Sequence, residues 1–326
     1  MKQLSYLLLI LILLLSGCCK DDENPGWVKH SGNPVMLPGT IFDWDREFVG
    51  LGSVIYHSNK YHMWYSGGRF YSWKIGHATS PDGIIWTKDV NNPVLDKGTT
   101  GSWDAGMAHS PIVMVVNNTF HMWYTGWKGV TVDFDNQIGH ATSPDGITWT
   151  KDPNNPVLPT GPDGAWDHGW VVAYSILYDG NKYHMWYGAW DGINFTYPRI
   201  GHATSPDGLT WTKDPANPVL VADAGSWDFP RVDFPSVIFD GTTYHMWYSG
   251  GSMYSWKIGY ATSADGSSWT KYSSNPVLGT GKEGSWDSRS VATMSVLDNS
   301  GKFMMWYWGS KTENSASIGY AEVSHN

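Results

Sequence analysis

Short runs of β-branched and aromatic residues recur along the chain, and Gly, Asn-Pro and Asp-Gly turns separate them. Such runs are typical of β-strands, and such turns are typical of the tight connections between neighbouring strands. The three-to-four-residue spacing of apolar positions that marks an amphipathic helix is absent throughout. We therefore predict an all-β fold.

One unit repeats five times along the chain. Each unit opens with a Trp-Asp pair, and successive pairs lie 59, 63, 61 and 59 residues apart. An aromatic strand follows, then Ile-Gly-His/Tyr-Ala, and four units close with Asp-Gly-x-x-Trp-Thr-Lys and an Asn-Pro-Val turn. Repeats of this length with four strands each are typical of propeller blades. We therefore predict a five-bladed β-propeller with four antiparallel strands in each blade.

The two ends of the chain indicate how the ring closes. The fifth unit stops at Ala321 and lacks the final Trp-Thr-Lys strand, while an equivalent strand, Trp27 to Lys29, stands at the N-terminus. We expect this N-terminal strand to complete the last blade, because a closed ring leaves no free sheet edge.

The first residues predict export. A lysine precedes an apolar run over residues 7–15 that is too short to span a bilayer, and small residues precede Cys18. This pattern resembles a lipobox in which Cys18 carries the lipid, the alternative being an ordinary signal with a chance cysteine. We predict a signal peptide over residues 1–17, a lipidated tether over residues 18–26 and the propeller over residues 27–326. The segment Lys20-Asp21-Asp22-Glu23 resembles an acidic surface-export tag, although a solvated tether explains it equally well. The expected location is the bacterial outer membrane, at the cell surface.

Composition narrows the function classes. The net charge of −9 and the lack of a long basic run argue against a nucleic-acid partner. Cys18 and Cys19 are the only cysteines, so the propeller has no disulfide and no thiolate metal site. No nucleotide-binding or serine-hydrolase motif is present, and we expect no cofactor. A channel metal ion such as calcium, with His109 or His168 as a ligand, stays open.

The repeat separates scaffold from site, because one substrate seldom needs five identical contacts. Three repeated positions account for 15 of the 21 tryptophans, so aromatic richness alone is weak evidence for sugar binding. The Asp-Gly turn lacks one residue of the sialidase Asp-box, and we expect Asp82 and its equivalents to bond nearby backbone amides instead. Function should therefore lie where the five units differ.

The segment after each Trp-Asp pair is polar and differs between units, and in a propeller it leads into the strand that lines the central channel. The candidates in these segments are Arg46, Glu47, His109, His168, Trp170, Arg231, Asp233 and Arg289. Loops between the second and third strands should rim the same opening with Arg69, Trp127, Lys128, Asp133, Asp135, Trp190, Asp191, Asn194 and Arg199. Trp127 and Trp190 occupy equivalent positions and are either sugar platforms or loop packing.

The five-fold repeat, the Asp-Gly-x-x-Trp turn and the tyrosine-rich second strands resemble the five-bladed propellers of glycoside hydrolase families 43, 32 and 130. Families 43 and 32 place carboxylates early in the innermost strands, and Asp233-Phe234-Pro235 resembles their Glu-Gly-Pro pattern. The resemblance implies that Asp233 is the general acid, which needs a raised pKa. Alternatively, Asp233 forms an ion pair with Arg231 along one strand.

The chain departs from that pattern in the other units. In the other units, the positions where these families have a second carboxylate contain no acidic residue. Glu47 and Asp191 are the available substitutes for a base. Family 130 phosphorylases use one aspartate with a basic phosphate site. That site could be formed here by Arg46, Arg231, Arg289, His109 and His168.

Three functions fit these residues. The first is a glycoside hydrolase that acts on a polysaccharide or oligosaccharide at the cell envelope, with Asp233 as acid and Glu47 as base; a phosphorylase ranks below it. The second is a non-catalytic glycan-binding lipoprotein that uses aromatic residues such as Trp127, Trp170 and Trp190. The third is a scaffold subunit of an outer-membrane glycan-uptake complex. The expected partners are a carbohydrate and, through Cys18, the membrane.

Overall fold

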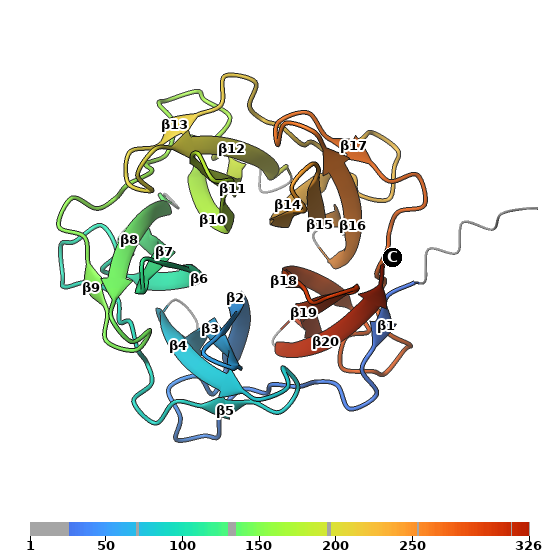
Figure 1. The fold of residues 1–326 in the computed structure, drawn as a ribbon, viewed down its shortest axis with the longest axis horizontal. Coiled ribbons are helices and arrows are strands. Elements are labelled where there is room, and N and C mark those ends of the chain that lie inside the picture. The colour runs from blue at the N-terminus through green and yellow to red at the C-terminus, as the bar shows by residue number, and fades with distance from the viewer. Residues whose placement is uncertain are drawn as a thin grey trace, which may run out of the picture.

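A computed structural model describes residues 26–69, 72–129, 135–193, 197–252, 254–313 and 315–325. Five four-stranded antiparallel sheets surround a central channel, which confirms the predicted five-bladed β-propeller (Figure 1). The predicted signal peptide, Cys18 and residues 18–25 of the tether lie outside the described residues. Within the described ranges, no helix could cross a membrane.

The strands follow the repeat. In the first blade they are β2 (Phe48–His57), β3 (Lys60–Arg69), β4 (Ser72–Ser80) and β5 (Thr87–Lys88). In the second they are β6 (Met107–Val116), β7 (Thr119–Trp127), β8 (Gln137–Ser143) and β9 (Thr150–Lys151). In the third they are β10 (Trp170–Tyr178), β11 (Tyr183–Trp190), β12 (Arg199–Ser205) and β13 (Thr212–Lys213). In the fourth they are β14 (Arg231–Phe239), β15 (Tyr244–Ser252), β16 (Ser255–Ser263) and β17 (Thr270–Lys271). The fifth contains β18 (Ser290–Asp298), β19 (Lys302–Ser310) and β20 (Ser317–Ser324).

The N-terminal strand completes the fifth blade. Strand β1 (Val28–Lys29) pairs antiparallel with β20, as the sequence predicts. Lys29 Nζ lies 2.6 Å from the buried Asp287 carboxylate. The first blade contains the same ion pair between Lys88 and Asp45, also at 2.6 Å. The Trp-Asp pair and the Thr-Lys strand are therefore the two halves of one repeated contact, and in the fifth blade this contact joins the two ends of the chain.

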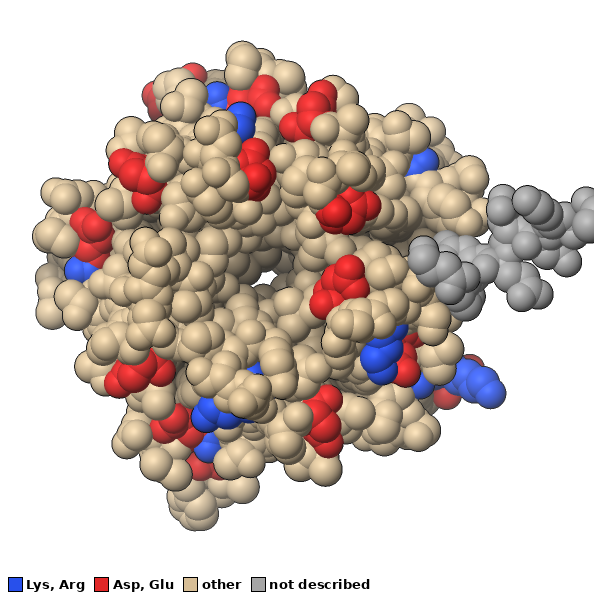
Figure 2. All heavy atoms as spheres, in the orientation of Figure 1, with Lys and Arg blue, Asp and Glu red and all other residues tan. Residues whose placement is uncertain are grey.

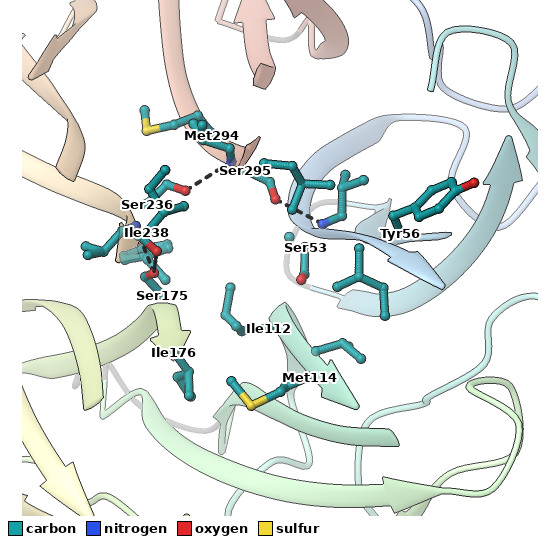
Figure 3. A pocket seen from close by; sticks show the side chains of 18 of the residues that line it. Ser53, Tyr56, Ile112, Met114, Ser175, Ile176, Ser236, Ile238, Met294 and Ser295 are labelled. Carbon is teal, nitrogen blue, oxygen red and sulfur yellow. Dashed lines mark hydrogen bonds between the residues drawn. The ribbon is translucent and has the colours of Figure 1, made fainter. Parts of the chain in front are cut away.

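The first strands of the blades line the channel, and each contains one β-bulge. Beyond the bulge, the hydroxyls of Ser175, Ser236 and Ser295 join neighbouring strands around a cavity of about 370 Å³ (Figure 3). Ser295 Oγ accepts from the Val54 amide, and Ser236 Oγ accepts from the Val296 amide. These hydroxyls are used by the scaffold, and the repeated column that contains them is architectural.

The Asp-Gly turns tighten the boundary between adjacent blades, which we call a seam. In the turn at Asp82, its carboxylate accepts the Ile84 and Ile85 amides at 2.9 Å, as expected from the sequence. The carbonyl of the turn glycine accepts the indole N–H of a tryptophan from the preceding blade. Four such bonds link Trp64 to Gly146, Trp123 to Gly208, Trp186 to Gly266 and Trp306 to Gly83.

Candidate active site

A cavity of about 340 Å³ lies where the five innermost strands begin, and we call it the central cavity. The same column of each innermost strand contributes to it, and this column contains Gly50, His109, Val172, Asp233 and Ala292. Five equivalent positions therefore hold five different residues around one cavity. This is the variation between blades that marks a site rather than a scaffold.

A β-bulge directs these side chains. In the fourth blade, Asp233 pairs with Ser249 and Ser236 pairs with Trp247, so Phe234 and Pro235 together face the single residue Tyr248. Phe234 adopts a φ of 54°, a left-handed conformation that bulky residues rarely take. Ser110 and Thr293 adopt positive φ at the equivalent bulges of their blades. Bulges of this kind re-aim side chains and are common beside active sites.

Asp233 is buried, with 3% of its surface exposed. Burial raises the pKa of its carboxyl group to about 7, although the Phe234 amide and the Arg231 guanidinium both oppose the rise. The Phe234 N–H donates to Asp233 Oδ1 at 2.8 Å. Among the described residues that line the central cavity, Asp233 is the one carboxylate. At neutral pH this group is therefore present in both its protonated and its ionised form, as a general acid requires.

Gly188 makes room for this carboxylate. At two other seams, a hydroxyl on the second strand of one blade accepts the bulge amide of the next: Ser66 Oγ accepts from Ser110 at 2.8 Å, and Ser249 Oγ from Thr293 at 3.3 Å. Gly188 holds the equivalent position in the third blade and has no side chain. A Cβ at Gly188 would collide with Asp233 Oδ1. The Asp233 carboxylate therefore takes the place of the hydroxyl and accepts the bulge amide itself.

Seven aromatic side chains line the central cavity. They are Phe48, Trp73, Trp170, Tyr174, Phe234, Trp256 and Trp308. Phe48 and Trp73 stack with ring centroids 4.7 Å apart, and Phe234 packs edge-on between Tyr174 and Trp256. Burial and the nearby Asp233 carboxylate raise the pKa of Tyr174, so its phenol stays protonated and can donate a hydrogen bond. Aromatic faces combined with a few polar groups are typical of small-molecule sites.

Several buried polar atoms of the wall lack a protein partner. His109 Nε2, Asn136 Oδ1 and Trp308 Nε1 have no hydrogen-bond partner among the described residues. Burial lowers the pKa of His109 to about 4, so its imidazole is neutral at physiological pH. Its other nitrogen, Nδ1, lies 3.0 Å from Ser110 Oγ. Because buried polar groups are normally hydrogen-bonded, three unsatisfied atoms around one cavity indicate a bound polar ligand or water.

The two proposed substitutes for a second carboxylate do not line this cavity. Glu47 is 39% exposed and pairs with Arg46 at 3.4 Å. The Asp191 carboxylate accepts the Ile193 amide at 3.0 Å in the loop that follows β11. Their assignment as the base stays a prediction from the sequence.

The predicted residues Arg46, Arg231 and Arg289 also lie outside the cavity wall. Arg231 lies over the ring of Trp256, with its guanidinium carbon 5.9 Å from the ring centroid. Its guanidinium lowers the pKa of Asp233. Arg289 pairs with Glu313 at 2.8 Å and donates to the Tyr254 carbonyl. Arg231 therefore touches the site through Trp256, and Arg289 is held at the surface.

Of the remaining candidates, Trp170 lines the central cavity. His168 is 43% exposed and lies 3.5 Å from Asp163. Trp127 and Trp190 are buried, and their indoles pack against Gly106 and Gly169, which favours loop packing over sugar platforms. Asp133 and Asn194 lie outside the described residues. The part of the chain that the structure describes has no cluster of three potential metal ligands.

The sequence contained a signal for the tryptophans of the cavity wall, of which only Trp170 is among the candidates from the sequence. Six tryptophans lie outside the three repeated positions. Four of these six, Trp73, Trp170, Trp256 and Trp308, line the central cavity. Removing the repeated positions from the tryptophan count would have found them, whereas the roles of Gly188 and Asn136 depend on seam geometry that the sequence does not display.

The central cavity thus combines aromatic walls with one buried acid inside a five-bladed ring. Residues 52–169 match the family model for the glycosyl hydrolases family 32 N-terminal domain. An uncharacterized protein of Mycobacterium tuberculosis is 31% identical over 226 residues, covering 67% of this chain and 72% of its own length. The chain belongs to the same family as that protein.

Solved structures share the fold at low sequence identity. A thermostable family-43 glycoside hydrolase superposes with a TM-score of 0.67 at 21% identity, covering 83% of this chain and 88% of its own. A β-1,2-mannobiose phosphorylase from Listeria innocua, in complex with β-1,2-mannobiose, superposes with a TM-score of 0.69 at 14% identity, covering 91% and 96%. Both resemblances concern the fold.

Proposed function

We propose that this protein cleaves a glycosidic bond in the central cavity and that Asp233 is the general acid. The observation that carries the proposal is the buried Asp233 carboxyl group, whose pKa is raised to about 7 within an aromatic wall. Its protonated form would donate to the leaving oxygen as the bond between that oxygen and the anomeric carbon breaks. The aromatic rings would hold the sugar, and Asn136 and His109 would bind its hydroxyls.

The charge of the wall favours water over phosphate as the attacking group. Among the described lining residues there is no lysine or arginine, and the neutral His109 cannot supply a positive charge. A phosphorylase would need cationic groups that bind phosphate oxygens in pairs. Figure 2 likewise shows mostly uncharged residues around the central opening on the face that it displays. Hydrolysis is therefore the proposed reaction, and β-1,2-mannosides are among the substrates to be tested.

A second function, glycan binding without cleavage, is favoured by one specific observation. Inverting hydrolases that use two carboxylates place them roughly 6.5–9.5 Å apart. In the central cavity, the described residues supply only Asp233. A wall with a single acid could bind a sugar and leave its linkage intact.

One experiment separates these functions. The protein is incubated with β-1,2-mannobiose, arabinan, xylan and fructan, with and without inorganic phosphate, and free sugar and sugar phosphate are quantified. Hydrolysis predicts free sugar that does not depend on phosphate and that Asp233→Asn reduces at least a hundredfold. Glu47→Gln and Asp191→Asn serve as matched carboxylate controls that should retain activity if neither is the base. Binding without release of any product would favour the second function, and a sugar phosphate would overturn hydrolysis.

A further inference from the structure

Four of the five seams share one arrangement of two indoles around one carbonyl. At the first of them, Gly146 O accepts the indole N–H of Trp64 at 2.8 Å and that of Trp149 at 3.0 Å. The two rings are perpendicular, with centroids 6.3 Å apart. The other three turn glycines, Gly83, Gly208 and Gly266, each accept two indole N–H groups in the same way. In each of these seams, two indole N–H groups therefore donate to the carbonyl oxygen of one turn glycine and link the two blades.

The seam between the fourth and fifth blades keeps the indoles but lacks the turn. Trp247 and Trp27 occupy the two tryptophan positions, with centroids 6.0 Å apart and an interplanar angle of 87°. In the fifth blade the outer strands β20 and β1 come from opposite ends of the chain, so no Asp-Gly turn connects them as one connects β4 to β5. No hydrogen bond from either indole N–H to a described residue is observed, and neither residue has a further contact outside the described ranges. The two indoles thus occupy the positions that, in the other four seams, converge on a carbonyl oxygen.

A cavity of about 640 Å³ occupies this place, and we call it the seam cavity. Six aromatic side chains line it, those of Trp27, Phe239, Trp247, Tyr260, Tyr272 and Phe303. Polar groups on its wall include Asp240, His245, Asp298 and His325. His245 Nε2 lies 3.0 Å from the Asp240 carboxylate, and His325 Nε2 lies 3.0 Å from the Asp298 carboxylate. The wall therefore combines flat apolar faces, two free donors and carboxylate oxygens.

We propose that the seam cavity is a second binding site and that its ligand is a neutral saccharide. A sugar hydroxyl would accept the two indole N–H groups at the position of the absent carbonyl. The apolar face of the sugar ring would stack on the aromatic side chains, and other hydroxyls would donate to Asp240 and Asp298. The two carboxylates disfavour an anionic ligand. The proposal does not depend on cleavage at Asp233, because the central cavity and the seam cavity share no lining residue.

The test uses the full mature chain with the central cavity impaired by Asp233→Asn and Trp170→Ala. Binding of β-1,2-mannobiose, cellobiose, xylobiose and arabinobiose is measured by calorimetry, and crystals soaked with the tightest of them locate the sugar. We expect a saccharide at the seam, and we expect Trp247→Phe, which keeps the ring but removes the donor, to weaken binding about tenfold. Tyr272→Ala, at a partly exposed position, should weaken it independently of any effect on folding.

Trp186→Phe is the matched control, because Trp186 holds the same position in a seam whose carbonyl is present. It should lower the thermal stability and leave saccharide binding unchanged, whereas Trp247→Phe should leave the stability unchanged. The proposal is overturned if none of the four disaccharides binds at the seam. It is also overturned if Trp247→Phe lowers the stability as much as Trp186→Phe does, since the chain's own terminal residues would then satisfy the indole.

Discussion

Asp233 Oδ1 lies against the Cα of Gly188, in the space that a side chain on the neighbouring blade would fill. Elsewhere in the ring that space holds a hydroxyl that accepts a bulge amide, as Ser66 does for Ser110. The third blade has a glycine, Gly188, where other blades have a serine, and Asp233 of the fourth blade accepts the bulge amide in place of the serine hydroxyl. This arrangement buries the Asp233 carboxyl group beside the central cavity.

Gly188→Ala should displace Asp233, because the added methyl group and the carboxylate cannot occupy the same space. We expect kcat/KM to fall about a hundredfold or more, which is the usual contribution of a positioned general acid. The measurement is a rate comparison on whichever glycoside the protein cleaves. In the Asp233→Asn background, Gly188→Ala should cost little more, because the two changes act on the same group. Additive losses would show that Gly188 acts through something else.

The activity should depend on the protonated form of Asp233. Its pKa is raised to about 7, so kcat/KM should be level at lower pH and should fall about tenfold per unit above pH 7. Arg231 opposes this rise, so Arg231→Gln should move the descending limb to higher pH. A limb that moves to lower pH in this variant would contradict the electrostatic assignment.

Paired histidines should make the fold sensitive to acid. His62 and His77 lie 3.1 Å apart, and so do His121 and His140, each pair joining the second and third strands of a blade. Burial, together with the neighbouring imidazole, lowers the pKa of His62 and of His140 from 6.5 to about 4. Between those pH values the unfolded chain binds protons that the folded chain does not. The free energy of unfolding should therefore be unaffected above pH 6.5 and decline towards pH 4.

The fourth blade offers a matched substitution for this test. It places Tyr260 opposite His245, at the position that His140 holds in the second blade. His140→Tyr should leave stability near pH 8 close to that of the parent and reduce the loss at pH 4. One pKa unit corresponds to about 1.4 kcal/mol. Urea unfolding at pH 8, 6 and 4 measures the difference. If His140→Tyr lost as much free energy of unfolding between pH 8 and pH 4 as the parent does, the histidine pairs would not be the cause of the acid sensitivity.

Removal of Lys29 should open the fifth blade. Asp287 is buried, and without Lys29 its carboxylate would lose its cationic partner, at a cost of about 3 kcal/mol. Lys88→Ala in the first blade removes the same contact from Asp45 and is the internal comparison. Urea denaturation should give similar losses for both variants. If Lys88→Ala lowered the free energy of unfolding and Lys29→Ala did not, β1 would contribute little to the closure of the ring.

The proposed lipid anchor is tested at Cys18. Expression in a Bacteroides host with labelled palmitate should give a labelled, membrane-associated protein, and Cys18→Ala should release the chain from the membrane. Cys19→Ala is the neighbouring control and should keep the label. A wild-type protein that stays unlabelled would leave the secretory signal without a lipid function.

The fold was predictable from the sequence because the same four-strand pattern recurs in five units. The same pattern identified the strand that begins at Trp27 as the missing strand of the fifth unit. The site was predictable in part: Asp233, His109 and Trp170 meet in one cavity because their columns differ between blades. The surroundings of Glu47 and Arg289 were not, because each pairs locally with an opposite charge that lies outside the repeated pattern. The burial of Trp127 depends on loop glycines whose packing is invisible in the chain order.

The contact between Lys29 and Asp287 joins residues 258 positions apart, whereas Lys88 and Asp45 are 43 apart. Four blades can form their lysine contact as soon as their own unit leaves the ribosome. The fifth must wait for the whole polypeptide, and bringing such distant ends together carries the largest loop-closure entropy in the ring. Ring completion is thus expected to be the slow, late event of biosynthesis. A nascent chain stalled before residue 287 would present an unfinished edge to chaperones and proteases.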